Sequence, residues 1–162
     1  MIDKLPGSSR RRGREVALQV LYALDVSSWK DALPEGEEAN GSPAIDEGPA
    51  VQDAFAAVEE SFEMPPGARD FAQLLVTEVR DQMPSLDAPI RAHSANWRIE
   101  RMAIVDRNIL RLGAYELLRT DTPLQIVLNE AVDLAWRFGS DPSPAFVNGI
   151  LDALAASLRE PA

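Results

Sequence analysis

The sequence predicts an all-α protein, a compact bundle of about seven helices, and three observations support this fold class. Apolar residues recur at helical spacing in several separate segments. Proline and glycine stand where these segments begin and end. No stretch shows sustained β-type alternation between hairpin turns. With 162 residues, 46% of them hydrophobic, the chain can bury one core, so we expect a single domain over residues 1–162.

The first helix is predicted over residues 10–26. Ser8 and Ser9 can cap it, and its buried stripe comprises Val16, Val20, Leu21 and Leu24. Residues 31–49 follow, with three prolines, three glycines and six acidic residues but few large apolar groups. Such a segment cannot offset its ordering entropy, so the sequence predicts a mobile acidic loop there.

Three shorter helices are expected next. Pro49 suits the first turn of the second helix, whose stripe is Val51, Phe55, Val58 and Phe62. After a break at residues 65–67, a third helix carries Phe71, Leu75, Val79 and Met83, and Pro84 should stop it. A short fourth helix is suggested by Leu86 and Ile90.

The last three helices give the strongest signal. Residues 104–119 have apolar side chains in most directions, which predicts a central, nearly enclosed helix. Pro123 can open the next helix and Gly139 can cap its C-terminus, with core positions Ile126, Val127, Ala131, Leu134, Ala135 and Phe138. Ser143 and Pro144 form an N-cap and N1 pair for a final helix with Phe146, Val147, Ile150, Leu151, Leu154 and Leu158.

Charge is distributed unevenly along the chain. The formal net charge is −10, which at first argues against binding to nucleic acid. However, residues 1–14 hold five cations and one acid, and residues 31–63 hold ten acids and no Lys or Arg. The acidic segment therefore accounts for the net charge, and the chain has a basic N-terminal arm (1–14) that is compatible with RNA binding.

Several classes of function are not expected. The chain has no cysteine and one histidine, His93, which leaves no disulfide framework and no metal site. Asp106 and Glu130 could be imagined as catalytic carboxylates, but no nucleophile, ligand set or phosphate-binding glycine loop accompanies them. No apolar run suits a membrane span or a secretory signal. We therefore expect a cytoplasmic protein that acts without catalysis, metal or cofactor.

The arginine cluster of the arm is the first candidate binding site. Arg10, Arg11, Arg12 and Arg14 lie at a helix start, where the macrodipole disfavours cations unless a polyanion is bound. The alternative is a solvated charge run. Tyr22 follows Arg14 by eight residues, roughly two turns along the same face of the helix, and could stack on an RNA base or belong to the core.

Charged residues on the predicted buried helices need partners, and internal ion pairs are the expectation for Asp106, Arg107, Arg111, Glu116 and Glu130.

Three blocks of sequence are similar, in order and spacing, to one known family: RRRGREVALQVLYALD, NWRIERMAIVDRNILRLGAYELL, and IVLNEAVDLAWRFG followed by FVNGILD. The chain resembles the NusB family of bacterial transcription antitermination factors. The resemblance implies an all-α fold of two small helical subdomains. It also implies binding of single-stranded boxA RNA jointly with the ribosomal protein NusE, within RNA polymerase complexes that transcribe ribosomal RNA operons.

The resemblance also implies roles for individual residues. Arg10, Arg11, Arg12 and Arg14 match the arginine-rich RNA-binding arm of the family, and Tyr22 matches an aromatic residue beside it. Phe146 opens the FVNG motif, which lies near the RNA in the family, and Asp106 matches an acidic position on the NusE-binding surface. Asn129, Glu130 and Asn148 are interpreted as structural. The loop 31–49 departs from the family pattern, since it is longer and richer in Pro and Gly than the resemblance leads us to expect.

Two other readings remain open. NusB-like domains also occur fused to RNA cytosine methyltransferases, although the chain leaves no room for a cofactor-binding α/β domain after its last helix. The second is an all-helical interaction module or homodimer without direct RNA contact. Gel filtration with and without boxA RNA would separate this reading from RNA binding.

Overall fold

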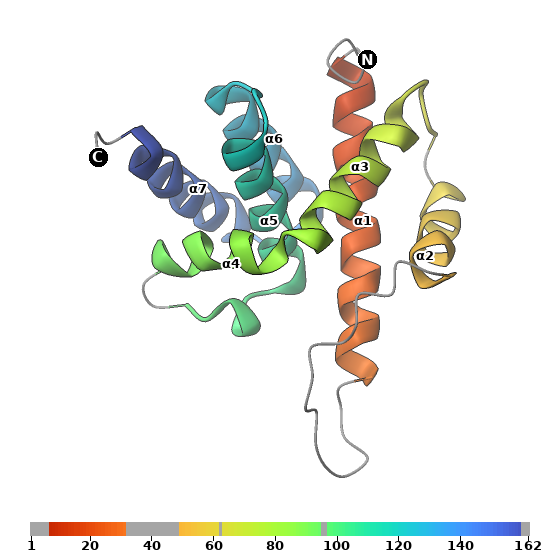
Figure 1. Cartoon of the computed structure of the whole chain (residues 1–162), viewed down its shortest axis with the longest axis horizontal. Coiled ribbons are helices and arrows are strands. Elements are labelled where there is room, and N and C mark those ends of the chain that lie inside the picture. The colour runs from red at the N-terminus through yellow and green to blue at the C-terminus, as the bar shows by residue number, and fades with distance from the viewer. Residues whose placement is uncertain (1–6, 32–48, 62, 95–96, 160–162) are drawn as a thin grey trace. The chain divides into compact units, whose positions relative to one another are not determined.

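The computed structural model describes residues 7–31, 49–61, 63–94 and 97–159 (Figure 1). These ranges contain α-helices, one short 3-10 helix over Ile99–Arg101 and no strand, which confirms the predicted all-α class. The helices are α1 (Gly7–Asp31), α2 (Pro49–Glu59), α3 (Ala68–Asp81), α4 (Met83–Ala92), α5 (Ile104–Arg119), α6 (Leu124–Phe138) and α7 (Ser143–Arg159).

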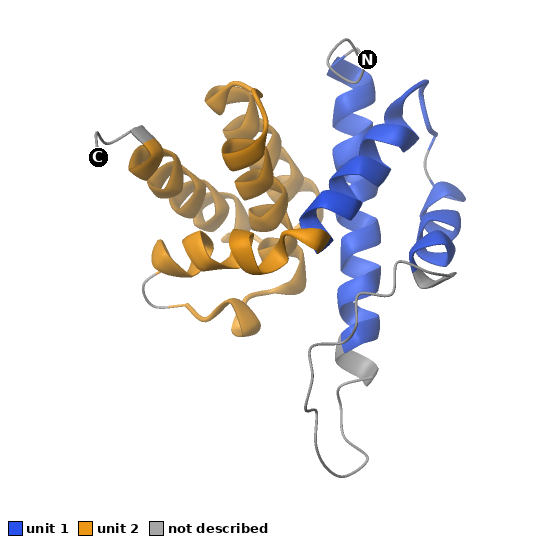
Figure 2. Cartoon of the chain, in the orientation of Figure 1, with its two compact units in different colours: residues 1–80 blue, residues 81–162 orange. Residues whose placement is uncertain are grey.

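The chain divides into two compact units, residues 1–80 and residues 81–162 (Figure 2). The first unit is built on α1, α2 and α3, and the second on α4 to α7.

In the first unit, α2 packs on α1, and α3 approaches the start of α1 at Gly13. A methyl group at Gly13 would lie 2.7 Å from Cδ1 of Phe71 and 3.1 Å from the carbonyl oxygen of Ala68. The absence of a side chain at Gly13 therefore permits this close approach. The core of the unit is formed by Val16, Val20 and Leu21 of α1, Phe55 of α2, and Leu75, Val76 and Val79 of α3.

In the second unit, α5 and α7 each contact the other three helices, and α5 is the more continuously buried of the two. Residues 106–116 of α5 are buried without interruption, which confirms the enclosed helix predicted from the sequence. A methyl group at Gly113 would lie 2.6 Å from Cδ1 of Leu151, so this glycine lets α5 and α7 approach closely.

Both predicted boundaries of the first helix were wrong. Helix α1 spans Gly7–Asp31 rather than residues 10–26, so Ser8 and Ser9 lie in its first turn. Asp31, which was assigned to the loop, is the last residue of α1, whereas Pro49 begins α2, in agreement with its predicted place in a first helical turn. The rest of the predicted loop, residues 32–48, lies outside the described residues, as do residues 1–6 of the arm and Phe62.

Pro84 does not stop a helix as predicted. It occupies the first turn of α4, since α3 already ends at Asp81. A proline is tolerated in a first turn because its missing N–H would have no intrahelical partner there.

Two predicted core positions are also wrong: Ile126 of α6 is 46% exposed and Leu158 of α7 is 52% exposed. The apolar stripe of each helix is wider than the surface that its neighbours cover.

At the C-terminus of α6, Gly139 caps the helix as predicted, and its N–H donates to the carbonyl oxygen of Ala135. Ser143 is the first residue of α7, and its hydroxyl oxygen accepts a hydrogen bond from the Ser140 N–H at 3.0 Å.

The difference between two leucines of α7 can be measured. Leu154 is fully buried, so Leu154→Ala should destabilise the fold by about 2–5 kcal/mol through lost burial and a residual cavity. Leu158→Ala, one turn later on an exposed position, should change the free energy of unfolding by less than about 0.5 kcal/mol. Urea denaturation of both variants tests this, and equal losses would show that Leu158 is buried in solution.

Candidate nucleic-acid interface

The four arginines of the arm lie in the N-terminal part of α1, whose first turn carries no acidic residue. Arg11 is exposed, and Arg10 and Arg12 are half-buried. Arg14 is only 4% exposed, and its guanidinium carbon lies 5.5 Å from the centroid of the Phe71 ring. The structure therefore places the four cations in different environments, with Arg14 packed inside the first unit.

Arg12 has an internal partner. Its Nη1 lies 2.7 Å from Oε2 of Glu15, one turn along the helix, and Glu15 is 3% exposed. A buried carboxylate needs a compensating cation. Arg12 therefore contributes to the stability of α1 as well as to the charge of the arm.

Tyr22 is 40% exposed, so its hydroxyphenyl ring can be reached by a ligand. The expectation that it shares a face with Arg14 was wrong, because Arg14 is buried. Eight residues turn a helix through about 800°, which leaves the two side chains about 80° apart. Arg11, eleven residues before Tyr22, projects in nearly the same direction, but Leu18 between them is fully buried. The arm and the tyrosine thus do not form a continuous basic and aromatic stripe on α1.

The second unit contains a pocket of about 210 Å³ that brings together two of the predicted site residues, Asp106 and Phe146. Asp106 lies in the first turn of α5, and Phe146 lies near the start of α7. The lining residues are Trp97, Arg101, Met102, Ala103, Asp106, Pro142 and Phe146. The pocket therefore lies where α5 and α7 both begin.

Asp106 is 8% exposed, and its Oδ1 has no hydrogen-bond partner among the described residues. The ion pair predicted for this residue is thus not formed through Oδ1. The neighbouring Arg107 contacts the backbone of Glu100, with 3.5 Å between its Nη1 and the carbonyl oxygen. Asp106 therefore lines the pocket while its Oδ1 is buried without a donor among the described residues, an exception to the usual pairing of buried polar groups.

Two aromatic rings form another part of the wall. The centroids of Trp97 and Phe146 lie 5.9 Å apart and the ring planes meet at 78°, an edge-to-face contact. Trp97 is 59% exposed, although tryptophan side chains are on average largely buried in folded proteins.

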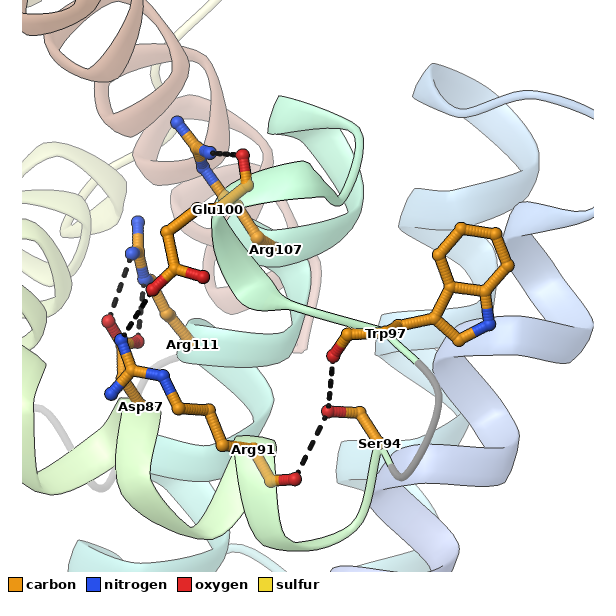
Figure 3. A network of polar contacts seen from close by, with 7 residues as sticks. All are labelled: Asp87, Arg91, Ser94, Trp97, Glu100, Arg107 and Arg111. Atoms are coloured by element: carbon orange, nitrogen blue, oxygen red, sulfur yellow. Dashed lines mark hydrogen bonds and ion pairs between the residues drawn. The ribbon is translucent and has the colours of Figure 1, made fainter.

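Hydrogen bonds on both sides hold the segment that carries Trp97 and Arg101 (Figure 3). The Ser94 hydroxyl lies 3.2 Å from the carbonyl oxygen of Trp97 and 3.4 Å from that of Arg91. Arg91 also pairs with Glu100, with 3.0 Å between Nη2 and Oε1. Hydrogen bonds from its own backbone and from Arg91 lower the pKa of the Glu100 carboxyl. These contacts fix the backbone of the pocket's outer wall.

The internal ion pair expected for Arg111 is present, and its partner is Asp87 of α4 (Figure 3). Nε and Nη2 of Arg111 donate to Oδ1 and Oδ2 of Asp87 at 2.9 and 3.1 Å, and both side chains are 9% exposed. Nη1 also donates to the side-chain oxygen of Asn108 at 3.3 Å. This bidentate pair joins α4 to α5, whose first turn carries Asp106. In Figure 3 the indole of Trp97 points away from it.

Two further findings concern the described residues as a whole. No three of their His, Asp or Glu side chains come together in a group that could hold a metal ion. None of their helices is both long enough and apolar enough to cross a membrane.

The fold and these sites define an all-helical protein of two small units, with an arginine-rich first helix and an aromatic-lined pocket in the second unit. The chain belongs to the NusB family, whose profile matches residues 11–156. It is 42% identical to the transcription antitermination protein NusB of Myxococcus xanthus over 154 residues, which cover 94% of this chain and 99% of that protein.

Solved structures agree with this membership. T. maritima NusB superimposes with a TM-score of 0.69 at 28% identity and covers 94% of this chain and 92% of its own. The complex of the antitermination factors NusB and NusE with double-stranded RNA also gives 0.69, at 26% identity, and covers 94% of this chain and 99% of its own. These matches confirm the predicted family and fold, and they place the chain among transcription antitermination proteins rather than enzymes.

Sequence reasoning missed part of the pocket. Trp97, Arg101 and Pro142 lie in the connections before α5 and α7, where no periodic pattern marks a buried or a binding position. The available signal was the composition of one connection, a tryptophan and cations just before the central helix.

Proposed function

We propose that this protein is a transcription antitermination factor that binds single-stranded boxA-type RNA together with the ribosomal protein NusE. It acts in the cytoplasm as part of RNA polymerase complexes on ribosomal RNA operons. The observation that carries the proposal is the NusB family match over residues 11–156. A solved NusB relative of the same fold is bound to both NusE and RNA.

The RNA-binding part of the proposal assigns phosphate contacts to Arg10, Arg11, Arg12 and Arg14, and base stacking to Tyr22 and Phe146. Arg11 is the exposed member of the cluster, and α1 begins without an acidic residue to oppose a phosphate. Tyr22 is exposed and Phe146 lines the pocket, as stacking residues must.

The partner-binding part assigns a contact with the NusE-type partner to Asp106. The carboxylate is held in the first turn of α5 and has one oxygen without an internal partner. A cationic group of a partner would compensate this buried acceptor.

RNA binding measured with and without the NusE-type partner tests the proposed function. The full chain should bind a boxA oligonucleotide clearly more tightly when the partner is present, because two surfaces then hold one RNA. Gel filtration of the same mixtures reports the complex directly. A partner that leaves RNA affinity unchanged, and a chain that elutes as a dimer without RNA, would contradict the proposal in favour of an interaction module.

Asp106→Lys should weaken association with the NusE-type partner at least about tenfold, because it places a cation where the proposal needs an anion. The lysine stem can reach solvent through the pocket, so helicity should be retained. Isothermal titration calorimetry and circular dichroism measure the two quantities. Asp152→Lys, the same change at an exposed position of α7, is the control. Equal partner affinities in Asp106→Lys and wild type would refute the assignment.

A further inference from the structure

One arginine of the arm is held against α3 by an aromatic contact. The guanidinium carbon of Arg14 lies 5.5 Å from the centroid of the Phe71 ring. We infer that Arg14 is a positioning residue of the RNA-binding arm: stacked on Phe71, it fixes the part of α1 that carries the arm and does not itself contact phosphate. The cations that this contact positions are Arg10 and Arg11. The inference rests on the proposed RNA-binding function and narrows its four phosphate contacts.

Burial separates Arg14 from a phosphate contact. Arg14 is 4% exposed and Phe71 is 7% exposed, whereas Arg11 is exposed. An arginine that binds phosphate presents its planar fork of N–H groups to the ligand. Arg14 would have to leave the Phe71 ring to do so, and cation–π contacts are strongest where they are desolvated. The Arg14 guanidinium therefore stabilises the packing of α3 on α1 instead of reaching the RNA.

The Phe71 ring also contacts the residue before Arg14. A methyl group at Gly13 would lie 2.7 Å from Cδ1 of Phe71 and 3.4 Å from its Cβ. The ring thus packs against two consecutive positions of α1, the backbone of Gly13 and the guanidinium of Arg14. Consecutive positions of an α-helix point about 100° apart. Contacts in both directions fix the rotation of this turn of α1 as well as its distance from α3.

Arg10 and Arg11 lie one turn before this contact. Arg10 precedes Arg14 by four residues, so the two share a face of α1, and Arg11 is adjacent to Arg10. Backbone hydrogen bonds join successive turns of a helix, so the turn of Arg10 moves with the turn of Arg14. Hydrogen bonds to phosphate depend on distance and angle. A shift of α1 on α3 would therefore weaken RNA binding although both exposed cations remain.

The test compares charge rescue at two positions of the same cluster. Fluorescence anisotropy of a labelled boxA-type oligonucleotide gives the affinity of the full chain, with the NusE-type partner, over a range of salt concentrations. Arg11→Met should reduce the magnitude of the slope of log affinity against log salt by roughly 0.7, as expected for one lost phosphate contact. Arg11→Lys should keep the wild-type slope, because lysine also supplies a cation to the phosphate.

Arg14 should respond differently from Arg11. Arg14→Met and Arg14→Lys should both weaken binding by about fivefold at the wild-type slope, the size expected for one lost stack. Lysine restores the charge but not the planar group that stacks on the ring. Phe71→Leu should have the same effect, and its combination with Arg14→Met should add little, because the two residues make one contact. Val79→Ala, a buried change elsewhere on α3, should leave the RNA affinity of the folded protein unchanged.

Circular dichroism at the assay temperature shows whether each variant is folded. If the Arg14 variants do not fold, Phe71→Leu decides alone, and wild-type affinity in that variant overturns the inference. A slope that falls by roughly 0.7 in Arg14→Met and returns in Arg14→Lys overturns it, because Arg14 is then a phosphate contact. Folded Arg14 variants with wild-type affinity overturn it too, since Arg14 then affects stability only. A wild-type chain that binds no oligonucleotide, with or without the partner, overturns both this inference and the proposed function.

Discussion

Removing either partner of the Asp87–Arg111 pair is expected to cost about 3–5 kcal/mol of the free energy of unfolding. Both side chains are 9% exposed and joined by two hydrogen bonds, so Asp87→Ala or Arg111→Ala leaves a buried charge without its main partner. The loss is a large fraction of the roughly 5–15 kcal/mol that is usual for the free energy of unfolding of a folded protein. Urea denaturation followed by circular dichroism gives the magnitude for each variant.

The double variant Asp87→Leu, Arg111→Met supplies the control. With both charges removed and the volume roughly retained, the second unit should recover most of the stability lost in either single variant. Arg91→Ala offers a second comparison, because the Arg91–Glu100 pair is exposed and should contribute less than about 1 kcal/mol. Single variants at Asp87 and Arg111 that cost no more than Arg91→Ala would contradict the expected dependence on burial.

Helical periodicity was sufficient to place the helices, because each buries an apolar stripe whose spacing survives in the sequence. The boundaries were less predictable. Pro84 is acceptable both after a helix and in a first turn, and only the tertiary structure decides that α4 begins beside it. Ile126 and Leu158 have the right spacing for burial but lack a neighbour to cover them, and periodicity carries no information about neighbours.

The candidate sites were predictable where a motif marked them, and less so where packing determines them. Asp106 and Phe146 were both selected from the sequence, and the structure adds that they line one pocket. Arg14 looked equivalent to the other arginines of its cluster, but α3 places Phe71 beside it. Trp97 was not selected because the connection that carries it has no periodic pattern.

Phosphate contacts by the arginine arm should make RNA binding depend more steeply on salt concentration. If Arg10, Arg11, Arg12 and Arg14 all contact phosphates, they contribute about −3 to the slope of log affinity against log salt, at roughly −0.7 per contact with a single strand. Replacement of all four with alanine should flatten the slope and weaken binding to every sequence. Because Arg14 is buried over Phe71, part of the effect of this change would be lost stability.

A double variant avoids this difficulty. Arg10→Ala, Arg11→Ala leaves the Arg12–Glu15 pair and the Arg14–Phe71 contact in place and should reduce the slope by roughly 1.4. Arg119→Ala, which removes an exposed cation at the end of α5, is the matched control and should leave the slope unchanged.

Variants of the stacking residues should lose RNA affinity but keep the wild-type salt slope. A stacked ring contributes to affinity, but it displaces no counterion from the RNA. Tyr22→Ala and Phe146→Ala should each cost about 1–3 kcal/mol of binding free energy while the salt slope stays at the wild-type value. The two classes of variant therefore separate phosphate contact from base contact in one titration series. A folded Arg10→Ala, Arg11→Ala protein with the wild-type slope would show that these two arginines are solvated surface, because a phosphate contact cannot be lost without changing the number of ions released.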